Sequence, residues 1–381
     1  MQQEGEQPQP DADAAPGPEP TGAPPGDAAA AATVAEAAAP AAPAIVVEAS
    51  DASIARAAAM LRTGEVVAFP TETVYGLGAD ALNPAAVARV FEIKGRPLDH
   101  PVIVHLASAD DLAEWAVGIP DAARRLAEAF WPGPLTLILR RAPQVPDAVT
   151  GGQDTVGLRV PSHPVARALL EAFRGVEGDR RWTGIAAPSA NKFGRISPTA
   201  AEHVRADLGG AVELILDGGA AEVGIESTIV DLSGAHPVLL RPGAIGVAEI
   251  ERVLGEAPRA PEARAPRAPG RHPVHYAPRA KLRLLKRVAM LEALASHKGQ
   301  RVGVLALEVT VPRLAAGLQR VVPAVPARYA HELYAHLRAL DAQNVSQILV
   351  ELPPQTPSWA AINDRLARAA RGGEEGLEDA A

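Results

Sequence analysis

The sequence predicts an α+β fold, followed by a second and smaller α/β region near the C-terminal end. Short apolar runs typical of buried strands are separated by segments with helical periodicity. Two of these runs, 227–232 and 238–243, are spaced like a strand pair, which disfavours a regular alternation of parallel strands and helices. Beyond residue 280 the order becomes strand, helix, strand, helix, which predicts a small parallel sheet.

The chain has 381 residues, which is enough for two domains with tails. Hydrophobic residues make up 48% of it, so that a sizeable core can be buried. Residues 256–278 contain six prolines and read as an extended, semi-stiff linker. We therefore divide the chain into the following parts: a tail over 1–44, a main domain over 45–255, a linker over 256–279, a C-terminal domain over 280–371 and a tail over 372–381.

Charge is distributed unevenly along the chain. Residues 1–44 contain seven acidic side chains and no Lys or Arg, so they carry −7 of the formal net charge of −8. The rest is nearly neutral, which argues against a broad basic face for nucleic acid but leaves room for a local cationic pocket. The tail is rich in Ala, Pro and Gly without a hydrophobic period, and we expect it to be disordered.

Several classes of protein are excluded by composition. The chain has no cysteine, which rules out disulfides, thiolate metal sites and a cysteine nucleophile. No apolar run of about 18 residues is free of Pro and charge, so a membrane span is not expected. The N-terminus lacks the features of a secretory signal. We expect a cytoplasmic protein.

The elements of the main domain are expected in the order in which their patterns occur. A strand at 45–47 and a helix over 51–62 precede a strand at 66–69, which stops at Pro70 and opens into a hydroxyl-rich loop over 71–78. The remaining elements are a helix that contains Val87, Val90 and Phe91 and ends in the basic turn 94–97, a strand at 101–105, helices over 110–117 and 121–129 with acidic caps, strands at 135–139 and 155–161, a helix over 164–173, a strand that enters a polar loop within 184–191, a helix over 199–208 and strands at 212–216, 227–232 and 238–243. The C-terminal region should hold strands at 302–306 and 347–351 and helices over 330–341 and 358–370.

Two groups of polar residues could bind an anion. Lys94 and Arg96 form a basic turn, and such side chains bind phosphate oxygens; they could equally be solvated cations at a helix C-terminus. Ser189, Asn191 and Ser197 follow a strand and could contact phosphates, although these residue types also dominate ordinary turns.

Arg159 lies on a strand expected to be central, where a cation is costly unless it is paired. It could hold the carboxylate of an amino acid. The alternative is that it pairs with a nearby acid such as Glu72 or Glu226.

The order of these motifs resembles that of one family. PTETVYGLG at 70–78, KGRP at 94–97, HPVIVH at 100–105 and PSANKFGRISPT at 188–199 resemble the YrdC/Sua5 family of threonylcarbamoyl-AMP synthases. HYAP at 275–278, ELYAHLRALD at 332–341 and AAINDRLARAA at 360–370 resemble its longer, two-domain Sua5 branch. Departures include Arg271-His272-Pro273 in the linker and Gln355-Thr356-Pro357-Ser358-Trp359 before the last helix, where the family has a glycine-rich segment.

The resemblance implies a fold and a reaction. The fold would be a twisted mixed sheet with helices around a concave site, plus a small Rossmann-like C-terminal domain. The reaction would convert L-threonine, bicarbonate and ATP, with Mg²⁺, into threonylcarbamoyl-adenylate and pyrophosphate. Downstream tRNA threonylcarbamoyltransferase proteins would place the group on adenosine 37 of tRNAs that read ANN codons (t6A). Any binding of tRNA by this chain itself is expected to be weak.

The resemblance also implies roles for single residues. The catalytic cations would be Lys94 and Arg96. ATP would be bound by Arg96, His100, Thr155, Ser189, Asn191, Ser197, Arg241 and Tyr276. L-Threonine would be bound by Thr73, His105, Arg159, Ala187 and Ser227. No residue is assigned to a metal, and the C-terminal domain is given a structural or regulatory role without a site.

His100 departs from relatives that carry Asn at this position. An imidazole there would make nucleotide affinity depend on pH near about 6.5.

Three other functions remain open on the sequence. A double-stranded RNA-binding module of the same fold would need a basic surface that the near-neutral charge does not favour. A hydrogenase-maturation carbamoyltransferase contains a related module but is longer and has cysteine zinc fingers. An adenylate-binding regulator without turnover is the third.

Overall fold

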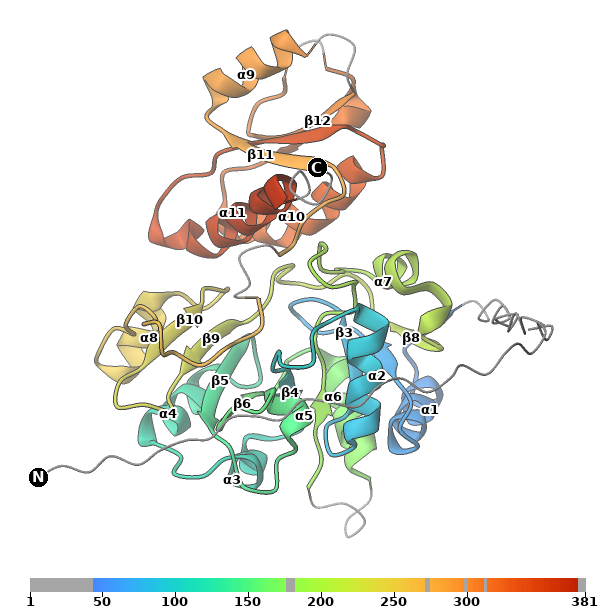
Figure 1. The fold of residues 1–381 in the computed structure, drawn as a ribbon, viewed down its shortest axis with the longest axis vertical. Coiled ribbons are helices and arrows are strands. Elements are labelled where there is room, and N and C mark those ends of the chain that lie inside the picture. Colours follow the sequence, from blue (N-terminus) through green and yellow to red (C-terminus); the bar gives the residue numbers. More distant parts are fainter. Residues whose placement is uncertain (1–43, 176–181, 271–274, 298–300, 312–313, 376–381) are drawn as a thin grey trace, which may run out of the picture. The chain divides into compact units, whose positions relative to one another are not determined.

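The computed structural model describes residues 44–175, 182–270, 275–297, 301–311 and 314–375 (Figure 1). The tail expected to be disordered lies outside these residues, except for Ala44. Among the residues described, no helix has the length and apolarity needed to cross a membrane.

A ten-stranded mixed sheet forms the centre of the main domain, as the α+β prediction requires. Its strand order is β1-β8-β2-β3-β7-β4-β6-β5-β9-β10, with parallel pairs such as β1–β8 and antiparallel pairs such as β2–β3. The strands are β1 (Ile45–Glu48), β2 (Val67–Phe69), β3 (Gly76–Asp80), β4 (Ile103–His105), β5 (Leu135–Arg140), β6 (Thr155–Arg159), β7 (Ile185–Ala186), β8 (Leu214–Asp217), β9 (Thr228–Asp231) and β10 (Val238–Arg241).

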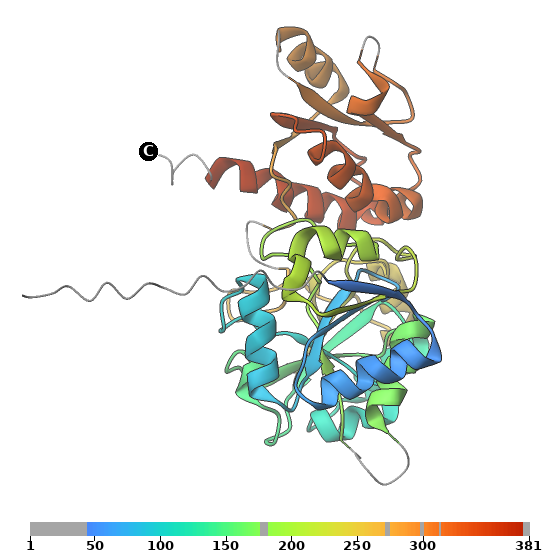
Figure 2. The same ribbon diagram turned by 90° about the vertical axis from the view of Figure 1, so that its right-hand side faces the viewer.

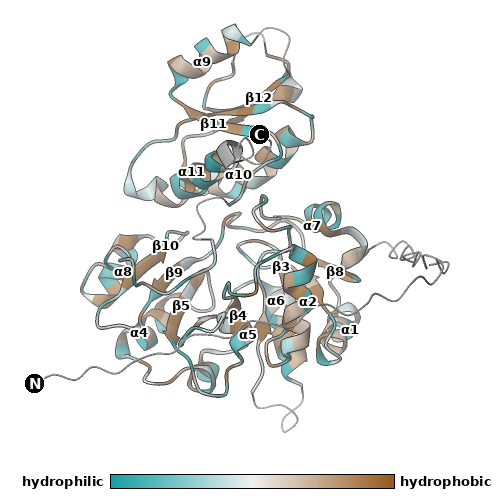
Figure 3. Cartoon of the chain, viewed as in Figure 1, coloured by the Kyte–Doolittle hydropathy of each residue, from teal (hydrophilic) through white to brown (hydrophobic). Residues whose placement is uncertain are grey.

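Helices cover both faces of the sheet (Figures 1 and 2). They are α1 (Asp51–Arg62), α2 (Pro84–Lys94), α3 (Leu112–Trp115), α4 (Asp121–Phe130), α5 (Asp147–Thr150), α6 (Pro164–Arg174), α7 (Ala201–Leu208) and α8 (Val247–Leu254). Val67 and Phe69 pack with α1 and α6, whereas Ala68 between them packs with α2 and α7. This alternation follows from the period of two in a strand. Because both faces of the sheet are covered, its strands consist largely of hydrophobic residues (Figure 3).

A smaller sheet lies in the C-terminal domain, and its strands are all parallel, as predicted. Its order is β11-β14-β12-β13. The elements are β11 (Lys281–Leu285), α9 (Arg287–Ser296), β12 (Val302–Leu307), β13 (Gln319–Val322), α10 (Pro326–Asp341), β14 (Gln347–Glu351) and α11 (Ala360–Glu375). Helices α10 and α11 pack on one face of this sheet and α9 on the other. Helix α11 runs past residue 371, where we expected a tail to begin.

Several local predictions differ from the structure. Residues 76–80, assigned to a loop as far as Gly78, form strand β3. Two glycines hide this strand from an apolar pattern, and Gly78 is needed because a Cβ there would lie 2.7 Å from the ring of Phe69. The strand expected to enter a polar loop within 184–191 is Ile185–Ala186, and the helix expected over 110–117 is the four-residue α3.

Other elements were not expected at all, or start differently. Helices α5, α8 and α9 and strands β11 and β13 were not predicted. The acidic caps expected for two helices are also wrong. Ser108 caps the 3₁₀ turn that leads into α3, and Pro120 precedes α4, so that Asp121 is already its first helical residue.

Candidate functional site

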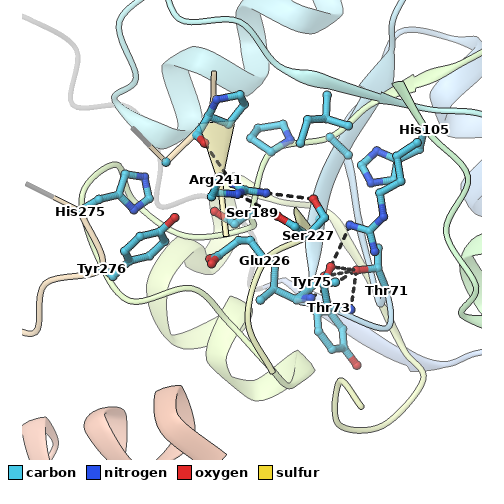
Figure 4. Close-up of a pocket in the computed structure, with 18 of the residues that line it drawn as sticks. Thr71, Thr73, Tyr75, His105, Ser189, Glu226, Ser227, Arg241, His275 and Tyr276 are labelled. Carbon is cyan, nitrogen blue, oxygen red and sulfur yellow. Dashed lines mark hydrogen bonds between the residues drawn. The ribbon is translucent and has the colours of Figure 1, made fainter. Parts of the chain in front are cut away.

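The main pocket lies where the ends of several strands meet the linker (Figure 4). The polar loop after β2, the ends of β4 and β6, the segment after β7 and the segment before β9 each supply side chains. Linker residues Gly270, His275 and Tyr276 close another side. Because these segments are far apart in sequence, the pocket exists only once the sheet has formed.

Arg159 is paired at one end of this pocket. Its guanidinium lies 2.7 Å from the carboxylate of Glu72 and donates a hydrogen bond of 2.9 Å to the Thr73 hydroxyl. Burial raises the pKa of Glu72, but the charge of Arg159 outweighs this, so the pKa is lowered and the acid stays ionised. The alternative considered for Arg159, a buried pair with an acid such as Glu72, is present in the structure, and Arg159 also lines the pocket.

His105 stands beside this pair. It ends β4, directly opposite Arg159 in the register of β4 and β6. Burial, and then the charge of Arg159, lower the pKa of His105 to about 3, so the imidazole is neutral at physiological pH. Its Nδ1 atom is buried and has no hydrogen-bond partner within the described part of the chain. This end of the pocket therefore offers a paired cation, a hydroxyl and a neutral imidazole.

Arg241 and Ser227 lie together in the lining of the pocket. Arg241 donates to the Ser227 hydroxyl at 3.0 Å and to its carbonyl at 3.0 Å, and it also donates to the carbonyl of Pro269 in the linker at 3.1 Å. The Ser227 hydroxyl lies 2.8 Å from that of Thr136. Both pocket residues are almost fully buried, which fixes their positions before any ligand arrives.

Arg96 lies between this pocket and a second cavity of about 320 Å³. Gly95, with φ of 63°, ends α2 and turns the chain so that Arg96 points inward. Its guanidinium donates to the carbonyl of Pro101 at 2.7 Å and lies near the rings of Phe91 and Phe193. Burial, and then Arg241, lower its pKa to about 10, so it remains a cation. The second cavity is also lined by His100, Phe193, Arg267 and His275.

The structure brings most of the predicted site residues together. Those that line the main pocket are Thr73, Arg96, His105, Arg159, Ala187, Ser189, Ser227, Arg241 and Tyr276. His100 lines the adjoining cavity. Lys94, Thr155, Asn191 and Ser197 line neither.

Lys94 is turned toward the protein. Its Nζ atom donates to the carbonyls of Ser189 at 2.5 Å and Asn191 at 2.6 Å, and burial lowers its pKa well below the usual value. The Asn191 amide donates to the carbonyls of Lys192 and Arg195. Lys94 and Asn191 therefore shape the loop that presents Ser189.

The other two outlying residues also face away from the pocket. Ser197 donates to the carboxylate of Glu226 at 2.5 Å. Thr155 begins β6, at the other end of the strand from Arg159.

Some pocket residues received no role from the sequence. Glu226, Gly270 and His275 line the main pocket. His275 was quoted within HYAP, but Glu226 had been considered only as a partner for Arg159. Nothing near Glu226 in the sequence reveals its partners: Ser197 lies 29 positions earlier, and Tyr334 on α10 and Arg365 on α11 lie more than a hundred positions later.

Two family models match the chain. One, Sua5/YciO/YrdC, described as "Telomere recombination", covers residues 59–243. The other, described as "Threonylcarbamoyl-AMP synthase, C-terminal domain", covers residues 245–371.

Named relatives match most of the chain. A threonylcarbamoyl-AMP synthase of Pyrococcus abyssi is 41% identical over 326 residues, which is 82% of this chain and 92% of the relative. One of Bacillus subtilis is 43% identical over 339 residues, 85% of this chain and 94% of the relative. The crystal structure of P. abyssi Sua5 complexed with L-threonine matches with a TM-score of 0.78 and 39% identity, covering 86% of this chain and 98% of that one.

The mixed sheet, the pocket at its strand ends and these matches define the class of protein: the chain belongs to the Sua5/YrdC family. Together the two family models cover both domains, and the relatives match across both as well. Within the family, the chain therefore belongs with the two-domain threonylcarbamoyl-AMP synthases of the Sua5 type. This favours an enzyme over the RNA-binding module and over the regulator without turnover.

Proposed function

We propose that this chain forms threonylcarbamoyl-adenylate and pyrophosphate from L-threonine, bicarbonate and ATP in the pocket described above. The observation that carries the proposal is that the lining of one pocket brings together two different groups of residues. One end has Arg159, Thr73 and His105; the other has Arg96 and Arg241. An amino acid and a triphosphate need these two kinds of environment side by side.

The first end suits L-threonine. Arg159 would bind the carboxylate through a charged hydrogen bond. The hydroxyls of Thr73 and Ser227 and the backbone at Ala187 would meet the amine and the hydroxyl of the substrate. His105 is neutral, so its imidazole can accept a hydrogen bond without repelling an ammonium group.

The second end suits the nucleotide. Arg96 and Arg241 would contact the phosphates, and Ser189 and Tyr276 would contribute hydrogen bonds. His100 lies in the adjoining cavity, where the rest of the nucleotide would fit. Lys94, Asn191, Ser197 and Thr155 would support these contacts from outside the pocket rather than touch ATP.

Mg²⁺ would enter with ATP. The described residues contain no group of three or more His, Cys, Asp or Glu side chains placed to hold a metal ion. The triphosphate itself supplies anionic oxygens, so Mg²⁺ is best regarded as part of the substrate. The residues of the chain then act on the complex as positioning cations.

The chemistry requires alignment more than acid–base catalysis. The threonine amine would attack the carbon of bicarbonate-derived CO₂ and lose a proton, which gives a carbamate. A carbamate oxygen would attack the α-phosphorus of ATP, and the bond to the β-phosphate bridging oxygen would break to release pyrophosphate. An enclosed pocket holds the labile carbamate near the phosphorus. Arg96 would offset charge that develops on the phosphates.

The proposal is tested by pyrophosphate release from ATP. We expect release to require both L-threonine and bicarbonate, and to fall strongly when L-serine replaces L-threonine. Release that proceeds without an amino acid, or no release under any condition, would contradict the proposal. The adenylate would then be the substrate of the downstream proteins that modify adenosine 37 of tRNAs.

A further inference from the structure

An arginine of the C-terminal domain reaches the wall of the pocket. Arg365 on α11 is fully buried, with 0% of its side chain exposed. Its Nε atom donates to a carboxylate oxygen of Glu226 at 2.9 Å, and Glu226 itself lines the pocket next to Ser227. Arg365 lies 139 positions after Glu226 in the sequence, yet only the side chain of Glu226 separates it from the pocket.

Both oxygens of Glu226 are occupied by protein donors. One accepts from the Ser197 hydroxyl at 2.5 Å, and the other from Arg365 and from the Tyr334 hydroxyl at 3.0 Å. Burial raises the pKa of Glu226, but Arg365 and then Arg241 outweigh it and lower the pKa. The carboxylate is therefore ionised in the folded protein, and its nearest cation comes from the C-terminal domain.

Arg365 also supports the linker tyrosine. Its guanidinium carbon lies 5.2 Å from the centre of the Tyr276 ring, which is a cation–π contact. Tyr276 stacks in turn on Tyr334, with ring centres 5.8 Å apart. Tyr276 has a φ of 64°, which a non-glycine residue rarely adopts, so the contacts around its ring must hold it there.

The charge of Glu226 matters because of the proposed ligand. A triphosphate would lie beside Arg241, and Arg241 and Glu226 line the same pocket. A buried carboxylate without a partner is costly by itself and would repel the phosphates. Arg365 removes both effects without occupying the pocket.

We propose that Arg365 is a positioning residue for the reaction. It neutralises Glu226 at the pocket wall, and through this charge pair the C-terminal domain makes the catalytic pocket competent to bind ATP. This inference deepens the proposed function and rests on it.

The test compares the affinity for Mg-ATP, measured by calorimetry, among four variants of the full chain. Arg365→Met should weaken ATP binding at least tenfold. Arg365→Met combined with Glu226→Gln should bind within about threefold of the wild type, because the unpaired charge is gone. Arg365→Lys should recover part of the loss. The matched control is Arg328→Met on α10, an exposed arginine that pairs with Glu332 at 3.0 Å, which should leave ATP affinity within twofold.

Two results would overturn the inference: unchanged ATP affinity in Arg365→Met, or a double variant that binds as weakly as the single one. If Arg365→Met fails to fold, the double variant decides alone, because its affinity either returns to within threefold or does not. These outcomes are independent of turnover. Wild-type protein that binds ATP but releases no pyrophosphate would contradict the proposed function, whereas the charge effect of Arg365 would still be measured.

Discussion

The guanidinium of Arg159 lies 2.7 Å from the carboxylate of Glu72, and both side chains are almost fully buried at the edge of the pocket. The ion pair therefore stabilises the fold, while the hydrogen bond from Arg159 to Thr73 orients the guanidinium toward the proposed threonine site. Substitutions can separate these two roles, because stability depends on the pair and substrate affinity depends on the cation.

Replacing Arg159 alone should lower both the stability of the protein and its affinity for L-threonine. Arg159→Met leaves Glu72 as an unpaired buried acid, and we expect the free energy of unfolding to fall by about 3–5 kcal/mol. Adding Glu72→Gln should restore most of this stability but not the affinity for L-threonine. The measurements are urea unfolding and the KM for L-threonine at saturating ATP. Recovery of the KM in the double variant would show that Arg159 is only a structural partner.

His105 should make stability depend on pH. Its pKa is lowered from 6.5 to about 3 in the folded state, so between these values the unfolded chain binds the additional proton. Its contribution to stability is therefore lost progressively as pH falls from about 6.5 toward 3, by at most about 1.4 kcal/mol per pH unit. His105→Gln should give a shallower dependence in urea unfolding over this range. Equal slopes for the two proteins would contradict the burial of a neutral imidazole.

Lys94 and Arg96 should respond differently to the same substitution. Lys94→Met leaves the buried carbonyls of Ser189 and Asn191 without their donor, which should cost about 1–3 kcal/mol of stability. Arg96→Met should abolish ATP-dependent pyrophosphate release with a smaller loss of stability. Thermal unfolding and pyrophosphate release distinguish the two. A stable Lys94→Met protein that loses pyrophosphate release as completely as Arg96→Met would assign Lys94 to the phosphates.

Gly270→Ala tests the linker contact without removing a charge. The φ of Gly270 is 77°, and a Cβ there would lie 2.3 Å from the Tyr276 hydroxyl and 3.1 Å from Nη1 of Arg241, so Tyr276 must move and Arg241 is crowded. Gly255 has a φ of 78° with nothing within 4 Å of the added atom, which makes Gly255→Ala a matched control for backbone strain alone. We expect at least a tenfold loss of kcat/KM for ATP in the first variant and less than twofold in the second. Equal effects would show that Tyr276 does not depend on this contact.

The sequence predicts the parts of this site that are local. Apolar runs and helix boundaries locate most elements of the main domain, and the motif around Lys94 and Arg96 lies where α2 ends. The sequence does not predict the direction in which a buried side chain points. Lys94 was therefore expected at the phosphates, whereas its amine donates hydrogen bonds to two backbone carbonyls.

Contacts between segments that are distant in the sequence could not be predicted from it either. Strand β3 has two glycines in place of apolar residues because Phe69 packs against it. In the sequence, Arg365 is one of several polar residues in an amphipathic helix, and its partner Glu226 is one of several polar residues in a loop. Only the docking of α11 on the main domain brings them together.

The carbon of bicarbonate should join L-threonine to ATP in a single pocket. The measurement supplies radiolabelled bicarbonate with ATP and follows the label into an adenylate. We predict incorporation with L-threonine, much less with L-serine, and none with Arg96→Met. Label that enters an adenylate equally well with either amino acid, or that never enters one in the wild-type protein, would contradict the proposed reaction.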